Sequence, residues 1–368
     1  MMTKRHKILY VASTASHLRR FHAPYLAELK KNADVYTMAT GEDVDFPVLF
    51  DKHFFSFANL RSIFKIRKIL KQEQFDAVLL HTTLAAFLVR AAMLLSRKRP
   101  YVLNVVHGYL FSKDQKGIKD RVLLLCEKLL RNNTDDIAVM NAEDLEIAQK
   151  HRLCRGRVDF INGMGVDGFW ELPHPDPALR ASFAATEQEL LCTFVGELSS
   201  RKNQIFLIRA LKALRDSGIP ARLLLVGEGG ERETLEAEIE ALSLQNAVFL
   251  TGNCEPVTPY LAISDLYVSA SRSEGLPFNV MEAMLCGLPI VASATKGQTD
   301  LLTDMPNSLY PLDDTDAFCR LVKDVYVQKN YGVGSRSYPV LSQYRLSSVF
   351  EKNIDVLTRG FLQRRKNE

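Results

Sequence analysis

Short apolar runs alternate with amphipathic segments along the first half of the chain. The runs are rich in Val, Ile and Leu, and each has the length of a buried strand. They are KILYVAS (7–13), AVLLHT (77–82), YVLNVVHG (101–108), DIAVMN (136–141) and VDFINGMG (158–165). Such runs separated by helical segments are typical of βαβ units, so we predict a mostly parallel sheet.

A second series of the same kind follows, and prolines at 173, 175 and 177 separate it from the first. Alternate prolines favour an extended connector. We therefore predict an α/β fold with two Rossmann-like domains, residues 1–170 and 171–341, and a helical segment over 342–368. The runs of the second series are LCTFVGEL (191–198), ARLLLVG (221–227), AVFLTG (247–252), DLYVSAS (265–271) and PIVASA (289–294). A chain of 368 residues also exceeds what one core usually supports.

The composition is that of a soluble globular enzyme, with 47% hydrophobic and 24% charged residues. The six cysteines are scattered and form no Cys-x-x-Cys pair, which favours reduced thiols in a cytoplasmic protein. The longest apolar stretch starts at Leu84 and is interrupted by Arg90, so it is too short for a membrane span. The first apolar run is likewise too short for a signal peptide.

Charge is divided unequally between the two halves. Residues 1–165 hold 27 Lys plus Arg against 17 Asp plus Glu, whereas the rest of the chain is acidic. In this basic half, residues 60–72 predict a helix with Ile63, Ile66 and Leu70 on one face and Arg61, Lys65 and Lys68 on the other. These cations are either solvated or rest on anionic lipid, which would place the protein peripherally at the inner face of the cytoplasmic membrane. No nucleic-acid partner is predicted.

The segment SEGLPFNVMEAMLCGLPIVAS (273–293) places two acids, Glu274 and Glu282, around a turn. Glu274 follows a predicted strand, Gly275 and Pro277 break the chain, and a helical composition resumes at Val280. Ligands bind at this rim of a parallel sheet, which suits a polyhydroxyl or phosphorylated ligand. The alternative is a solvent-facing loop Glu and a helix-capping Glu.

This acid, seven residues, acid pattern resembles the motif of retaining GT-B glycosyltransferases of family 4, which transfer sugar from a nucleotide-sugar donor. The resemblance implies two Rossmann-like domains facing across a cleft, with a terminal helix that crosses back to the first domain. It also implies that Glu274 lies by the donor sugar and that Glu282 holds the ribose. The backbone of Gly275, Leu276, Pro277 and Phe278 would approach the pyrophosphate.

A basic pair, Arg201 and Lys202, lies between a predicted strand and the helix after it, where it can meet a diphosphate. The resemblance maps the family's lysine onto Lys202. Glu197 stands where the family often has an arginine, so Arg201 is the candidate for the second cation. The alternative is a pair of solvated cations in a helix's first turn.

His107 ends a predicted strand, and the family places a histidine at this point of the acceptor domain, facing the donor sugar. His81 ends the preceding strand and either lines the same cleft or is a core histidine. Ser16 and His17 lie in the loop that contacts the acceptor in the family. Neither His17 nor His22 has metal-ligand spacing with an acid, so no metal is predicted.

Two further loops bear on the donor. The resemblance assigns donor contacts to Gln298 and Thr299 in KGQTD. The stretch LLLVGEGGERE lacks the third glycine of a dinucleotide fingerprint because Arg232 stands there, which argues against a dehydrogenase.

We therefore predict a retaining hexosyltransferase that moves sugar from a UDP-sugar to a glycan or lipid-linked glycan acceptor in surface polysaccharide biosynthesis. Arg201, Lys202 and helix N-termini would stabilise the leaving diphosphate without a metal or cofactor. The alternatives are a GT-B sugar-nucleotide epimerase, a phosphorylase, or a catalytically silent scaffold subunit of a polysaccharide assembly complex.

Overall fold

The computed structural model describes residues 5–367 except 52–55, 95, 97, 115–116, 167–173, 184–185 and 187. The chain divides into two compact units: a first unit of residues 1–165 and 343–368, and a second unit of residues 166–342. The boundary predicted at residue 170 and the connector's Pro173 lie outside the described residues.

The first unit is built on a seven-stranded sheet in which all pairings are parallel, in the order β3-β2-β1-β4-β5-β6-β7. Its central strands are buried throughout, as expected for a parallel sheet that is covered on both faces. The strands are β1 (His6–Thr14), β2 (Ala33–Thr40), β3 (Phe46–Pro47), β4 (Ala77–His81), β5 (Tyr101–Val106), β6 (Asp136–Val139) and β7 (Val158–Phe160).

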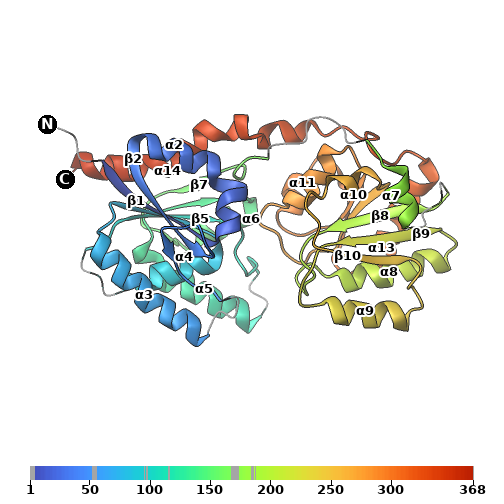
Figure 1. Cartoon of the computed structure of the whole chain (residues 1–368), viewed down its shortest axis with the longest axis horizontal. Coiled ribbons are helices and arrows are strands. Elements are labelled where there is room, and N and C mark those ends of the chain that lie inside the picture. The colour runs from blue at the N-terminus through green and yellow to red at the C-terminus, as the bar shows by residue number, and fades with distance from the viewer. Residues whose placement is uncertain are drawn as a thin grey trace. The chain divides into compact units, whose positions relative to one another are not determined.

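Helices cover both faces of this sheet. Helices α2 and α14 lie on one face, and α3, α4 and α5 lie on the other (Figure 1). The helices are α1 (Ala15–His17), the π-helix η1 (Leu18–His22), α2 (Ala23–Asn32), α3 (Phe57–Glu73), α4 (Thr83–Ala92), α5 (Ile118–Leu130), the short η2 (Arg131–Asn133), α6 (Ala142–Lys150) and α14 (Leu346–Asn367). Arg90, which interrupts the apolar stretch, is buried on α4 and donates two 2.8 Å hydrogen bonds to the Glu127 carboxylate on α5.

The C-terminal helix α14 packs into the first unit. Its Val356, Leu357 and Phe361 side chains are buried. The amide of Asn353 donates to the Tyr25 hydroxyl at 2.9 Å and to the Gly163 carbonyl at 2.8 Å. The last helix therefore completes the face of the sheet on which α2 lies.

The second unit repeats the design with a six-stranded sheet of parallel pairings in the order β10-β9-β8-β11-β12-β13. Helices α8, α9 and α13 cover one face (Figure 1). The strands are β8 (Leu190–Val195), β9 (Ala221–Val226), β10 (Val248–Gly252), β11 (Leu266–Ser269), β12 (Ile290–Ser293) and β13 (Leu309–Tyr310). The helices are α7 (Pro177–Ser182), α8 (Gln204–Asp216), α9 (Arg232–Ala241), α10 (Thr258–Ala262), α11 (Phe278–Leu285), α12 (Gln298–Leu301), η3 (Pro306–Ser308), α13 (Thr315–Gln328) and η4 (Pro339–Tyr344).

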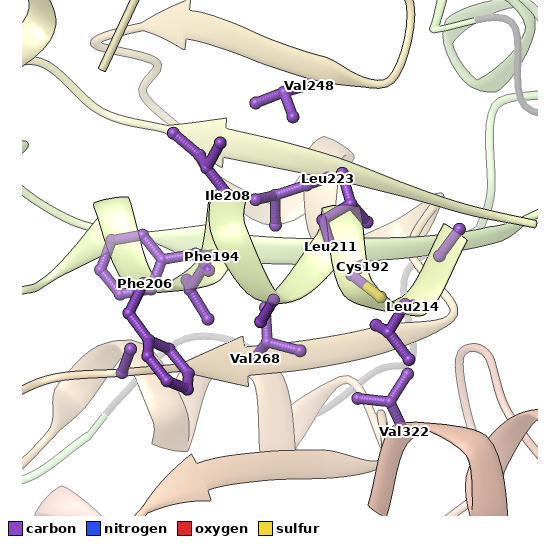
Figure 2. Close-up of a cluster of buried hydrophobic side chains, with 14 of the residues drawn as sticks. Cys192, Phe194, Phe206, Ile208, Leu211, Leu214, Leu223, Val248, Val268 and Val322 are labelled. Atoms are coloured by element: carbon purple, nitrogen blue, oxygen red, sulfur yellow. The ribbon is translucent and has the colours of Figure 1, made fainter. Parts of the chain in front are cut away.

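The core of the second unit forms where α8 lies across the sheet. Figure 2 shows Phe206, Leu211 and Leu214 of α8 beside Phe194 of β8 and Val268 of β11. Removing one such buried side chain typically costs about 2–5 kcal/mol of stability. This packing fixes β8 and β11, whose carboxyl ends carry the candidate site, on a rigid base.

The predicted fold class is confirmed, and each predicted strand coincides with an observed one. Three strands were not predicted: β2, β3 and β13. The strand β2 carries exposed Asp34 among its apolar positions, and β3 and β13 have only two residues each, so none forms a long apolar run. None of the described helices combines the length and the apolar character that a membrane crossing requires.

Candidate functional site

Three loops meet at one edge of the second unit's sheet, because β8, β11 and β12 are parallel neighbours and their carboxyl ends lie together. Gly297, after β12, approaches the loop after β11 closely. Its φ is +78°, and a Cβ there would lie 2.7 Å from the carbonyl oxygen of Gly275. Only glycine satisfies both conditions, so the two loops are held in contact.

The central contact of this edge joins Lys202 to Glu274. The Lys202 Nζ donates to Glu274 Oε1 at 2.6 Å, and the residues are 8% and 7% exposed. Arg201 donates to the other oxygen of the same carboxylate at 3.2 Å and to the Ser273 carbonyl at 2.9 Å. The structure thus brings the three predicted residues together around one carboxylate.

For each of Glu274 and Lys202, burial and the charge of the partner shift the pKa in opposite directions. Burial raises the pKa of Glu274, but Lys202 and Arg201 outweigh it, so the net pKa lies below the ordinary value. Burial lowers the pKa of Lys202, and Arg201 adds to this effect while Glu274 opposes it. Buried ion pairs contribute little net stability, because desolvation offsets their attraction. Their concentration at a ligand-binding edge therefore points to function.

Asn203 shapes the turn that presents Lys202. Its backbone is left-handed, with φ 58° and ψ 38°, a conformation that Asn tolerates better than most residues. The Asn203 amide donates to Asp313 Oδ1 at 3.1 Å, and Arg272 donates to Asn203 Oδ1 at 3.1 Å. These three supporting residues were missed in the sequence, where an Asn just before a helix was the one available signal.

The segment that follows Glu274 enters α11. Leu276 and Pro277 are buried, and the Asn279 amide donates to the Val195 carbonyl at 2.7 Å, which ties the first turn of α11 to the end of β8. Glu282 is half-buried one turn further along this helix. The backbone of Gly275 to Phe278 is thereby fixed beside the carboxylate of Glu274.

Gln298 and Thr299 brace the loop after β12. Gln298 is fully buried; its amide nitrogen donates to Ser269 Oγ at 2.6 Å, and its oxygen accepts from Ser293 Oγ at 3.0 Å. The Thr299 hydroxyl donates to the Thr295 carbonyl at 3.2 Å. Both side chains use their polar atoms inside the unit, so direct donor contacts for them stay a prediction.

The glycines of LLLVGEGG serve close loop packing. A Cβ on Gly227 would collide with the Gly196 carbonyl, and one on Gly229 with the Leu198 carbonyl. Glycine at these positions lets the loop after β9 lie against the loop after β8.

In the first unit, four histidines gather at the carboxyl ends of β1, β4 and β5. His81 ends β4, His107 follows β5, and His17 and His22 end α1 and η1. Tyr10 stacks on His81 with ring centroids 4.5 Å apart, and its hydroxyl is hydrogen-bonded to His22 Nδ1 at 2.9 Å. His81 Nδ1 and His107 Nε2 lie 3.3 Å apart. Ser16, beside this cluster, is exposed.

Burial keeps these imidazoles neutral. It lowers the pKa of His17 to about 4 and that of His107 to about 3. Burial and, secondarily, the neighbouring histidines lower the pKa of His22 and His81 well below the usual value. Each ring therefore offers one N–H donor and one lone pair at neutral pH. His22 was not predicted as a site residue, because only the π-helix brings it to the cluster.

Comparison with known proteins agrees with this fold. The Glycosyl transferase 4-like domain matches residues 10–162, and Glycosyl transferases group 1 matches residues 176–330. Two parallel-sheet α/β units of this kind are the architecture of the GT-B fold. The chain belongs to the family-4-like glycosyltransferases that these two descriptions cover.

Similar proteins include a putative glycosyltransferase, EpsD, of Bacillus subtilis, which is 29% identical over 88% of each chain. The UDP-Gal:alpha-D-GlcNAc-diphosphoundecaprenol alpha-1,3-galactosyltransferase of Escherichia coli is 24% identical over 76% of this chain and 73% of its own. Among solved structures, Anabaena HepE in complex with UDP and glucose superposes with a TM-score of 0.74 at 20% identity, covering 96% of this chain and all of its own.

Proposed function

We propose that the protein is a retaining glycosyltransferase that moves a hexose from a UDP-sugar to a glycan or lipid-linked glycan in surface polysaccharide biosynthesis. The observation that carries the proposal is the buried Lys202–Glu274 pair with Arg201 at the strand ends of the second unit. The E. coli relative, whose name gives UDP-Gal as donor and a diphosphoundecaprenol-linked sugar as acceptor, supports the choice of substrates.

The diphosphate of the donor would replace the Glu274 carboxylate as the hydrogen-bond acceptor of the two cations. Lys202 and Arg201 donate to Glu274 now, and charge-assisted hydrogen bonds to phosphate oxygens are of the same kind and strength. Glu274 would then be released to accept hydrogen bonds from the sugar hydroxyls, and Glu282 would hold the ribose. Because the cations lie ready before the reaction, they stabilise the charge that develops on the leaving diphosphate.

The bond changes follow from this placement. The acceptor hydroxyl attacks the anomeric carbon on the face from which the diphosphate leaves, and its proton passes to the departing phosphate oxygen. A new glycosidic bond forms as the sugar–phosphate bond breaks, with retention of configuration. His107 would hold the reacting sugar through its neutral imidazole, and Ser16, His17 and His81 would face the acceptor. No metal is required at the diphosphate.

We also propose a peripheral membrane contact through α3. Ser62, Ile66 and Ile69 are buried on its packed face. The outer face carries Phe57 and Phe64, exposed by 85% and 66%, next to the exposed cations Arg61, Lys65 and Lys68. Exposed aromatic rings are not expected on a helix face that contacts only water. A helix that lies at a membrane interface combines such rings with Lys and Arg.

A donor screen tests the function. The protein is incubated with UDP-, GDP- and ADP-linked hexoses, and the products are followed by NMR, which also reports the anomeric configuration. We expect hydrolysis or transfer from one UDP-sugar with retention, and no loss of rate in EDTA. An epimerised donor would assign an epimerase instead, and no binding of any donor would assign a silent scaffold. Activity that EDTA abolishes and manganese restores would contradict the metal-free mechanism.

A further inference from the structure

Three histidines of the first unit form a compact group of nitrogen ligands. His17, His22 and His107 each offer one ring nitrogen, and these atoms lie within 4.8 Å of one another. His22 is buried, and the other two are half-buried. This group could not be predicted from residue spacing, because His107 lies far along the chain from the other two.

The π-helix η1 creates the group. A π-helix closes i→i+5 hydrogen bonds, so it brings residues five positions apart onto one side, which the 3.6-residue period of an α-helix does not. His17 is its N-cap and His22 its last residue, and their ring centroids are 5.1 Å apart. The His107 ring lies 5.3 Å from that of His17 and 5.9 Å from that of His22. Single π-turns are rare and occur often at functional sites.

Two of the buried ring nitrogens are available to bind a ligand. Among the described residues, the buried Nε2 atoms of His17 and His22 have no hydrogen-bond partner. Leaving such a buried atom without a partner destabilises the folded protein. The opposite nitrogen of His22 is fixed by the Tyr10 hydroxyl, and His107 Nε2 is engaged by His81. Partners of this kind orient the rings of metal-binding histidines.

The chemistry of the three imidazole nitrogens narrows the choice of the bound species to certain metal ions. Three neutral imidazoles suit Zn²⁺, Cu²⁺, Ni²⁺ or Co²⁺ and not Mg²⁺ or Ca²⁺, which prefer oxygen. In a tetrahedral zinc site, Zn–N bonds of about 2.0–2.1 Å place the nitrogens about 3.3 Å apart. Small rotations of the rings would close the observed group to that spacing and leave a fourth position open.

We propose that His17, His22 and His107 form a binding site for a transition-metal ion of the zinc type. All three histidines belong to the first unit, whereas the residues proposed to bind the diphosphate belong to the second, and the proposal adds no catalytic metal to the transfer. A bound ion would occupy His107, and so it should inhibit transfer; this consequence alone rests on the proposed function.

Titration with Co²⁺ tests the site directly. The untagged full chain is stripped with EDTA, dialysed, and titrated while the visible spectrum is recorded. We expect one equivalent to bind with the intense visible bands of four- or five-coordinate cobalt, and Zn²⁺ to displace it. His17→Ala should weaken binding at least 100-fold, and Tyr10→Phe, which frees the His22 ring, by about 10- to 100-fold. His174→Ala, an exposed histidine of the second unit, is the matched control.

Several results would overturn the site: no visible bands of four- or five-coordinate cobalt, unchanged affinity in a folded His17→Ala variant, or a near-ultraviolet thiolate band that places the ion on cysteine. Circular dichroism of each variant establishes that it is folded. If Zn²⁺ binds with the expected variant pattern and yet transfer is not inhibited, the metal site stands and the proposed role of His107 fails. If no donor is turned over at all, the spectroscopic result still decides the metal site.

Discussion

Lys202 Nζ and Glu274 Oε1 lie 2.6 Å apart although 72 positions separate the two residues. The contact joins the loop after β8 to the loop after β11, and the Arg272 N–H adds a 2.8 Å bond to the Arg201 carbonyl between the same loops. One carboxylate therefore both joins these two loops and, in our proposal, receives the donor sugar.

Glu274→Gln is expected to lower turnover by about 10²-fold or more, since it removes a preorganised contact to the reacting sugar. It should also cost roughly 3–5 kcal/mol of stability, because Lys202 stays buried without its partner. The double variant Glu274→Gln/Lys202→Met separates the two effects: denaturant unfolding should show stability regained while activity stays low. Full activity in the single variant would remove Glu274 from the site.

Acid should abolish the contribution of this pair to stability. The pKa of Glu274 is lower in the folded protein than the ordinary 4.5, so the contribution is present above 4.5 and is lost as the pH falls through the folded value. Urea unfolding of the wild type and the double variant is compared near neutral pH and again below about pH 4. We expect the free energy of unfolding of the wild type to fall relative to that of the double variant on acidification. If the difference between the two free energies stays constant, the lowered pKa of Glu274 is contradicted.

Lys202→Ala should weaken binding of the nucleoside diphosphate product, because a hydrogen bond to a charged group contributes about 1.5–3 kcal/mol. This corresponds to a loss of roughly 10- to 150-fold in affinity, measured by calorimetry. Lys212→Ala provides the control, since Lys212 lies on α8, the helix that follows Lys202 in the chain, and pairs with Asp216 at the surface. Equal affinity in wild type and Lys202→Ala would place the phosphates elsewhere.

His107→Ala is expected to lower kcat more than it raises the donor KM, because the imidazole would act on the reacting sugar and not on the nucleotide. The assay contains EDTA, which keeps metal off the cluster. His151→Ala, at the end of α6 in the same unit, should behave as wild type. A collapse of donor affinity with kcat preserved would show that the assigned role is wrong.

Vesicle co-sedimentation tests the membrane contact of α3. We expect binding to anionic vesicles that falls with salt and is lost in Phe57→Ser/Phe64→Ser, since each nearby cation contributes about 1 kcal/mol and the rings insert between lipids. Val327→Ser, an exposed apolar residue on α13, is the control. Equal binding to neutral and anionic vesicles, or to neither, would exclude this contact and leave the transferase proposal unaffected.

The sequence was most informative where burial makes the chain uniformly apolar. Strands such as β4 and β5 are buried at every position and were therefore visible as runs. Glu274, Arg201 and Lys202 could be assigned to strand ends by spacing, because parallel strands end at one edge. That Lys202 would touch Glu274 depends on the left-handed turn at Asn203, which no spacing encodes.

Other features depend on geometry that a residue pattern does not carry. The amide of Gln298 is hydrogen-bonded to Ser269 and Ser293 because of the way in which two strand ends pack. His22 joins the histidine cluster through a π-turn, whose extra residue per turn breaks the α-helical period on which sequence reasoning relies.

The return of α14 to the first unit gives the chain an unusual dependence on its own last residues. The second unit is one continuous segment, whereas the first is assembled from both ends of the polypeptide. A ribosome must therefore synthesise the whole second unit before the first can be completed. A stop codon or a protease cut just after Tyr344 would spare every residue of the proposed donor site and would instead uncover one face of the first unit, where Tyr25 of α2 and Gly163 lose the Asn353 amide.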